Sequence, residues 1–290
     1  MIAPLLFVLG ALVVGLVFYD FLRTTISLSG LGPVSRWVTS GLWFAGSRLA
    51  VRSERRLGLS FRGLLGPSIL TSIAGTWILL HLAGYTLMFR AGSSLVETQS
   101  GDPATWVQTA AFAGSALSTL GASKVQVTNG WWDILSMVAA VNGMIVLTLS
   151  VSFILNVLQT TNSARTFAAR YHAVLSSRGE ESRPDPLRRA STLGPDLCGI
   201  AVRLAASPLP GIFVPSDPKM DFPAAVCDLC DLLEAEGLRS REEGAPGTEV
   251  SELRWAIGLL GRSYKFDSSQ TDVAAARDWA RRHTLPRPDV

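Results

Sequence analysis

The hydrophobic pattern divides the chain into two halves. Residues 1 to about 160 are apolar with short polar breaks, whereas residues 161–290 alternate between charged and apolar positions. A transmembrane helix needs about 20 consecutive apolar residues. Three runs in the first half reach that length: Met1–Tyr19, Leu64–Phe89 and Trp131–Leu158. The pattern therefore predicts an all-α membrane protein with three transmembrane helices, followed by a mostly helical carboxyl-terminal domain.

The first apolar run has two interpretations, an uncleaved helix or a cleaved signal peptide. A signal peptide begins with a basic segment and ends at a small-residue cleavage site. Neither feature accompanies Met1–Tyr19, and the charged sequence from Asp20 to Arg23 follows it directly. We therefore expect an additional amino-terminal transmembrane helix.

A fourth uncharged stretch, Ala104–Leu120, is about seventeen residues long and rich in Ala, Ser and Thr. That length is marginal for a full crossing, and such segments are more often re-entrant or buried in protein. Asp102 is expected to cap the start of this helix, and Pro103 to suit its first turn.

The distribution of basic residues predicts the orientation, because loops rich in Lys and Arg stay in the cytoplasm. Seven arginines lie between Asp20 and Gly63, whereas Arg90 and Lys124 are the basic residues of the stretch 90–130. We therefore expect a multi-pass protein of the inner (plasma) membrane with its amino terminus outside and its carboxyl-terminal domain in the cytoplasm. A re-entrant helix that enters and leaves on the outer side preserves this arrangement.

The composition agrees with a membrane location. Charged residues make up 17% of the chain, against about 25% in a typical soluble protein, and the mean hydropathy is +0.31. These values exclude a disordered chain, a collagen and an ordinary cytosolic enzyme. Three cysteines do not make a disulfide framework. We expect no enzymatic activity, no cofactor or bound metal, and no nucleic-acid partner.

The most specific signal follows the short uncharged helix. The order of outer helix, short helix, Thr-x-Gly-x-x segment and inner helix, over about Leu64–Leu158, resembles the two-transmembrane potassium channel family. The family's selectivity filter reads Thr-Val-Gly-Tyr-Gly followed by Asp. The residues here that match the filter, and the one at its outer mouth, are Thr119, Leu120, Gly121, Ala122, Ser123 and Lys124. The resemblance implies a homotetramer whose filter carbonyls replace the hydration shell of the ion.

Three departures from the family pattern bear on selectivity. Ser123 replaces the second glycine, Ala122 replaces the tyrosine that braces the filter, and Lys124 replaces the aspartate. A tetramer would then carry four positive charges at its outer mouth, which disfavours the entry of cations. These departures predict a weak, poorly selective monovalent cation current, or none. An ordinary loop after a short helix is the alternative interpretation of the segment.

The third apolar run offers a candidate pore lining. Asn142, Leu149 and Asn156 are seven residues apart and are expected to share one helix face. Polar side chains at that depth normally face a bundle interior or water. Gly143 is expected either to act as a hinge or to allow close helix packing. His81, inside the second run, is expected to hydrogen-bond to the short helix, with titration as the alternative.

Amphipathic segments predict further helices. One, Leu31–Ala50, is expected to lie on the inner leaflet or to connect to the cytoplasmic domain. The third run is expected to continue as a helix through Ala164–Ser177. The domain helices are predicted at Leu187–Ala206, Phe222–Gly237, Val250–Tyr264 and Thr271–His283.

Possible metal ligands in the carboxyl-terminal half are few. Cys227 and Cys230 form a Cys-x-x-Cys sequence, but a structural zinc site needs four ligands. Their apolar neighbours favour a buried helix face. His172 and His283 stand among mostly polar neighbours and are expected to be solvated.

These observations predict four segments: an amino-terminal transmembrane helix (1–20), a basic cytoplasmic or interfacial loop (21–63), a pore module (64–160) and a helical regulatory domain (161–290). The expected function is that of a subunit of a tetrameric pore for passive monovalent cation flow. Its expected partners are further copies of the chain, membrane lipid and monovalent cations. The alternative function is a non-conducting membrane scaffold or sensor that acts through the cytosolic domain.

Overall fold

A computed structural model describes most of the chain, namely residues 2–26, 30–57, 62–121, 124–176, 186–207, 209–213, 215, 217–243, 250–265 and 269–284. The chain divides into two compact units. The membrane unit consists of Met1–Ser27, Leu31–Gly41 and Ile69–Ile154, and the helical domain consists of Leu28–Gly30, Leu42–Ser68 and Leu155–Val290.

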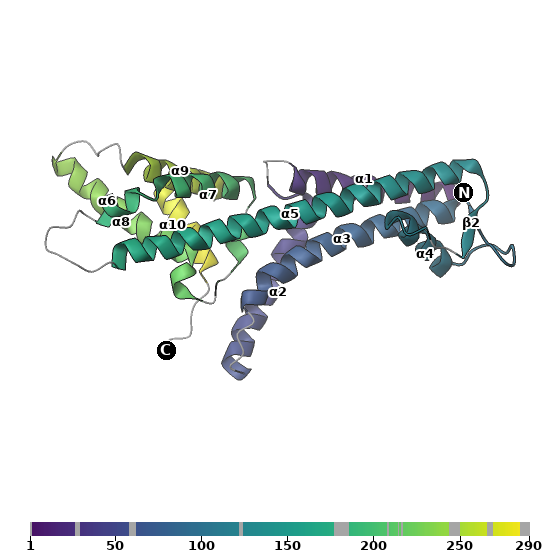
Figure 1. Cartoon of the computed structure of the whole chain (residues 1–290), viewed down its shortest axis with the longest axis horizontal. Helices are drawn as coiled ribbons and strands as arrows, with labels where there is room; N and C mark the ends of the chain where they lie inside the picture. The colour runs from purple at the N-terminus through teal and green to yellow at the C-terminus, as the bar shows by residue number, and fades with distance from the viewer. Residues whose placement is uncertain are drawn as a thin grey trace. The chain divides into compact units, whose positions relative to one another are not determined.

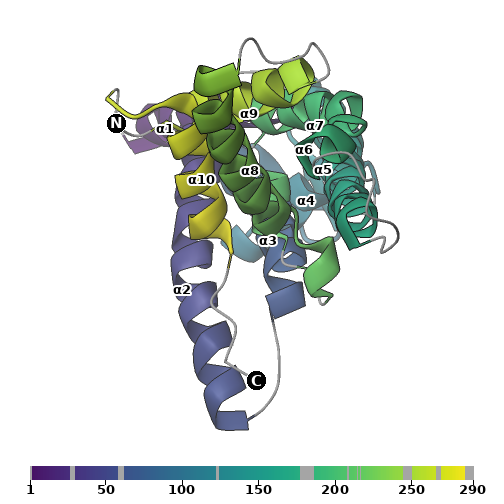
Figure 2. The same cartoon turned by 90° about the vertical axis from the view of Figure 1, so that its left-hand side faces the viewer.

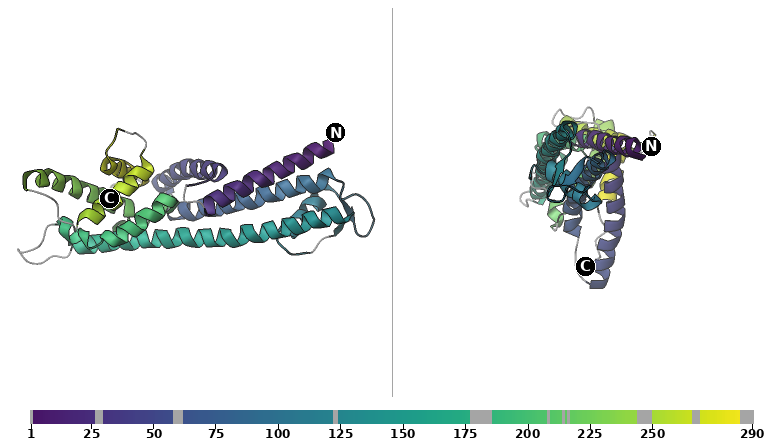
Figure 3. Two further views of the ribbon diagram at one scale, coloured as in Figure 1. Left: turned by 90° about the horizontal axis from the view of Figure 1, so that it is seen from above. Right: turned by 90° about the vertical axis from the view of Figure 1, so that its right-hand side faces the viewer.

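Three helices are long and apolar enough to cross a membrane: α1 (Ile2–Thr25), α3 (Arg62–Ala91) and α5 (Gly130–Ser176). Within the membrane unit they lie alongside one another (Figures 1 and 3). Phe21 of α1 packs edge-on against Trp77 of α3, with ring centroids 5.0 Å apart. The three long apolar helices predicted from the sequence are thus confirmed.

Helix α2 (Pro33–Leu57) corresponds to the predicted amphipathic segment. Trp37 on its surface is 80% exposed. An exposed indole on a basic amphipathic helix is typical of a helix that lies at a membrane surface.

The short helix α4 (Trp106–Leu117) lies in the chain between two short strands, β1 (Leu95–Glu97) and β2 (Val125–Val127), which pair antiparallel. The predicted cap at Asp102 is wrong. Thr105 caps α4 instead, and Gln108 completes a capping box by accepting a hydrogen bond from the Thr105 backbone N–H.

The helical domain contains α6 (Pro186–Ser191), α7 (Gly194–Ala206), α8 (Phe222–Glu243), α9 (Ser251–Tyr264) and α10 (Asp272–His283), with single 3₁₀ turns at Leu209–Ile212 and Pro218–Met220. Figure 2 shows α7 to α10 gathered into one bundle. The predicted helix Leu187–Ala206 is two helices, because the chain turns at Thr192 and Leu193 and a new helix begins at Gly194, with Pro195 in its first turn. The other three domain helices are confirmed within a few residues, apart from the longer end of α8.

The core of the helical domain is apolar and includes the last part of α5. Phe167 and Tyr171 of α5 are buried together with Trp279 of α10. Cys230 is also fully buried there, and burial raises the pKa of its thiol to about 12. Among the described residues, no group of three or more His, Cys, Asp or Glu side chains could hold a metal ion. The buried helix face predicted for the two cysteines is confirmed for Cys230, whereas Cys227 is half-buried and packs against this core.

His283 differs from its prediction. Its ring packs on the indole of Trp279 with centroids 5.0 Å apart, and its Nδ1 lies 2.8 Å from the Trp279 carbonyl oxygen. The expectation of a solvated ring was wrong, because the last turn of α10 folds against the core. Burial lowers the pKa of this imidazole.

Candidate pore site

Helix α4 ends beside the middle of the α5 apolar segment. A Cβ atom added to Gly143 would lie 1.9 Å from the carbonyl oxygen of Leu117, the last residue of α4. Gly143 is thirteen residues beyond Gly130, the start of α5, which corresponds to about 20 Å along the helix. Gly143 thus permits close packing, and α5 continues through it as a helix.

Helix α4 also packs against α3. The nearest side-chain atom to a Cβ built on Gly114 is Cδ1 of Leu82, at 3.5 Å, and the rings of Phe112 and Phe89 meet edge-on at 5.1 Å. The carboxyl end of α4 is therefore held between two of the three apolar helices.

The strand before α4 and the strand after it lie side by side. Leu95 in β1, before α4, pairs with Val127 in β2, after it. The Thr98 N–H donates to the Lys124 carbonyl at 2.9 Å. Because the entering and leaving strands pair, the chain enters the segment and leaves it at one end.

The residues predicted as a filter begin at the turn that closes α4. Thr119 has φ = 55°, a left-handed conformation that glycine usually supplies at this position. Its N–H donates to the Ala116 carbonyl at 3.0 Å, and the Leu120 N–H donates to the Ser115 carbonyl at 3.0 Å. These two bonds form a Schellman motif, so the backbone N–H groups of Thr119 and Leu120 serve to end the helix.

Beyond that turn the chain runs back toward β2. Leu120 is 72% exposed, and Gly121 also has a left-handed φ of 69°. Ala122 and Ser123 lie outside the described residues, and Lys124 is exposed.

A line of polar side chains is exposed along α5. It consists of Thr148, Ser152, Asn156 and Gln159, which we call the polar stripe. Their spacing of four, four and three residues puts them on one face of a single helix. Val146, Phe153 and Val157 on the other side of α5 are buried. Polar residues inside a membrane normally face a bundle interior or water.

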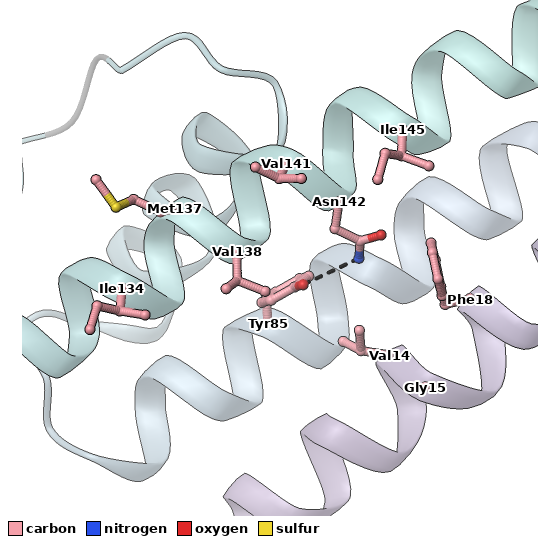
Figure 4. Close-up of a pocket in the computed structure, with 10 residues that line it drawn as sticks. All are labelled: Val14, Gly15, Phe18, Tyr85, Ile134, Met137, Val138, Val141, Asn142 and Ile145. Atoms are coloured by element: carbon pink, nitrogen blue, oxygen red, sulfur yellow. Dashed lines mark hydrogen bonds between the residues drawn. The ribbon is translucent and has the colours of Figure 1, made fainter.

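Asn142 does not belong to the polar stripe. Figure 4 shows its side chain directed at Tyr85 of α3, and its Nδ2 donates to the tyrosine hydroxyl at 3.2 Å. This pair lies at a cavity of about 490 Å³ whose other lining residues are apolar side chains and Gly15.

The predicted line of three residues is therefore split. Asn142 is buried, Leu149 is half-buried, and Asn156 is exposed on the polar stripe. A straight helix drifts by about 20° for every seven residues. Asn142 and Asn156 are fourteen residues apart, so their directions differ by about 40° and they do not have to face the same neighbour.

His81 is buried, and its Nδ1 lies 2.8 Å from the carbonyl oxygen of Trp77 in its own helix. The predicted hydrogen bond to the short helix is not formed. The other ring nitrogen has no partner among the described residues. The ring borders a cavity of about 120 Å³ together with Gly114 and Ser118.

The sequence reasoning missed the role of Asp20. This residue is completely buried, and its carboxyl group accepts from the Val34 N–H at 2.7 Å, the Ser35 hydroxyl at 2.6 Å and the Trp77 Nε1–H at 3.0 Å. It thereby joins α1 and α3 to the amino terminus of α2, where negative charge is favoured. An acidic residue at the end of an apolar run is the signal that would have singled it out.

Comparisons with known proteins support a membrane location. The chain is 32% identical over 151 residues to the uncharacterized membrane protein YdjJ of Bacillus subtilis (strain 168). The matched region makes up 51% of this chain and 43% of YdjJ. The chain thus spans less than half the length of that relative. No family model matches the chain, and no solved structure matches it at a significant level.

Proposed function

We propose that this chain is one subunit of a homotetrameric pore for the passive flow of monovalent cations. The observation that carries the proposal is the path of the α4 segment. A twelve-residue helix reaches the middle of α5 and ends there, and the strands on either side of it pair with each other. Irregular backbone at membrane depth is tolerated where it lines an aqueous cavity or is buried in protein.

The polar stripe of α5 supports the same proposal. Thr148 and Ser152 lie about 27 and 33 Å along α5 from Gly130, within the depth of the hydrocarbon core, where exposed polar side chains are unfavourable against lipid. Assembly around an axis would direct them into a shared aqueous path. One such segment per chain cannot enclose a pore, and closed cyclic symmetry is the usual solution. Cross-linking in native membranes should therefore proceed to tetramers, and products that stop at dimers would count against this assembly.

The proposal includes an orientation in the inner membrane. We place the amino terminus and the segment from β1 to β2 outside, with α4 re-entrant, and the helical domain in the cytoplasm. The arginine-rich stretch from Asp20 to Gly63 supports this placement.

Bilayer recordings of the reconstituted protein test the proposal. We expect a weak cation current with little preference for potassium over sodium. Lys124→Asp should raise this current, because it exchanges four positive charges at the outer mouth for four negative ones. Increasing salt should reduce the difference between the two proteins, since it screens exposed charge.

Lys219→Asp is the matched control. It makes the same charge change at an exposed position in the helical domain, and the current should not change. A strong potassium-selective current from the unmodified protein would contradict the filter interpretation. Tetramers that carry no current in any variant would contradict conduction.

The capping role of Thr119 favours a second candidate function. Two of its backbone features, the N–H and the left-handed φ, serve the end of α4. A pore-derived scaffold or sensor that acts through the helical domain would keep this geometry without conducting. Tetramers without current would support that function.

A further inference from the structure

The helical domain contains a cavity of about 450 Å³ between α5 and α7. Its floor is apolar, formed by the buried side chains of Phe167 and Ile200. Its polar lining comes from both helices and includes Asn162, Ser163, Thr166, Arg170, Asp196 and Arg203. A cavity of this size matches those that bind small organic ligands.

The charges around this cavity are predominantly positive. Arg170 forms an ion pair with Asp196 across the opening. Arg203, about two turns beyond Asp196 on α7, is exposed and has no carboxylate partner in the part of the chain that the structure describes. The three charged side chains sum to one net positive charge. A guanidinium group carries five N–H donors, so the pair with Asp196 leaves donors of Arg170 for a ligand.

Gly199 leaves part of the α7 wall open. It lies in the interior of the helix, and a Cβ atom added there would meet no atom within 4 Å. Glycine in a helix interior destabilises the helix relative to alanine, and packing does not require it here. A position without a side chain widens the cavity between Arg203 and Asp196.

We propose that this cavity binds a phosphate-bearing anion, with the phosphate between Arg170 and Arg203 and an uncharged part of the ligand over the apolar floor. Arginine matches the geometry of phosphate oxygens through paired N–H donors. The hydroxyl and amide groups of Ser163, Thr166 and Asn162 supply further polar contacts at the same wall.

Two sources of this chemistry are compatible with the position of the cavity. Asn162 lies thirty-two residues beyond Gly130 on α5, or about 48 Å along the helix, and a bilayer with its headgroups is about 40–45 Å thick. If α5 crosses the membrane as proposed above, the Asn162 end of the cavity lies at the inner headgroup layer and the rest extends into the cytoplasm. There it can receive the headgroup of an anionic lipid or a soluble phosphate ester.

The test uses the purified full chain in nanodiscs and two probes. The first probe is sn-glycerol 3-phosphate, titrated calorimetrically into nanodiscs of phosphatidylcholine. The second is phosphatidylglycerol, supplied as equal parts with phosphatidylcholine, with the retained lipid measured by native mass spectrometry. Saturable binding of the first probe identifies a soluble ligand, and preferential retention of the second identifies a lipid headgroup.

Three variants assign the binding to this cavity. Arg203→Gln should weaken binding at least tenfold, because it removes a charge-assisted hydrogen bond. Gly199→Leu should abolish binding by filling the cavity, and leucine is the better helix former, so unfolding of α7 does not explain the loss. Lys219→Gln removes an exposed charge elsewhere in the helical domain and should bind as the unmodified protein does.

Two results would overturn the proposal: no binding of either probe, or binding that Arg203→Gln and Gly199→Leu leave unchanged. Neither result depends on ion current. A protein that binds phosphate without conducting would contradict the proposed pore and leave this site intact.

Discussion

The polar groups of the membrane unit and of the helical domain differ in their burial and in their partners. In the membrane unit Asp20 is completely buried and is satisfied by donors from two other helices. In the helical domain the charged side chains pair near the surface, as Arg277 does with Asp231 at 2.6 Å and Glu234 at 2.9 Å. Side chains between lipid-facing helices have no water to bind, so each buried polar group needs a protein partner.

This difference determines what holds each unit together. The domain helices present a polar face to water and an apolar face to a common core, as soluble helices do. The membrane helices are apolar on nearly all sides, and their contacts depend on a few polar pairs and small residues. Substitutions in the two units should therefore act through different mechanisms.

Trp279→Ala should have the largest effect, a loss of about 4 kcal/mol in the stability of the helical domain. The indole is 2% exposed and stacks on Tyr264 with ring centroids 5.2 Å apart. Thermal unfolding of the detergent-purified chain, followed by near-ultraviolet circular dichroism, measures the change. Trp255→Ala is the control, because that indole is 50% exposed and its loss should change little.

Asp20→Ala should destabilise the membrane unit by about 3 kcal/mol, because several buried donors lose their acceptor. Asp20→Asn keeps one acceptor oxygen and should cost less. Asp102→Ala, at an exposed position between β1 and α4, should have no measurable effect. If Asp20→Ala unfolds at the same temperature as the unmodified protein, the contrast between the two units fails.

Gly143→Ala should cost about 2 kcal/mol by forcing α4 away from α5, since the added carbon overlaps the Leu117 carbonyl. Gly75→Ala is the matched control in α3, where a Cβ meets nothing within 4 Å. That change should be neutral or slightly stabilising. Equal destabilisation by the two alanines would show that close packing at Gly143 is unimportant.

The stability of the helical domain should fall slightly between pH 7.5 and 6. Burial lowers the pKa of His283 in the folded chain, so below about pH 6.5 the unfolded chain binds a proton more readily. Stability conferred by the neutral ring is thus present at higher pH and lost as the pH falls. His283→Phe should remove this slope in thermal unfolding at a series of pH values. A slope that persists in that variant would point to another titrating group.

The sequence predicted the helices of the domain better than the faces of the membrane helices. Amphipathic spacing located α9 and α10 within one or two residues of their observed starts, because core contact and spacing coincide there. In the apolar segment of α5, apolar residues occur on every face of the helix, so spacing alone could not tell that Asn142 faces Tyr85 while Ser152 is exposed.

Local turn chemistry also limited the prediction of the candidate site. Asp102 and Pro103 have the composition of a helix start, but Pro103 bridges Val96 and the helix begins after Thr105. The pairing of β1 with β2 joins residues thirty apart, and strands of three residues leave little signal in a sequence. The sequence shows an acidic residue at position 20, but it does not show which residues of α2 and α3 donate hydrogen bonds to it.

The accessibility of the polar stripe tests the central claim most directly. Single cysteines at Thr148 and Ser152, the stripe positions within the depth of the hydrocarbon core, should react with a membrane-impermeant cationic thiol reagent in intact proteoliposomes of a chain whose three native cysteines are replaced. A cysteine at Phe153, which is buried, and one at Leu12, which is exposed on the apolar surface of α1, should not react. Reaction confined to the stripe supports an aqueous path along α5. Protection of both stripe positions in assembled protein, equal to that at Leu12, would contradict a pore.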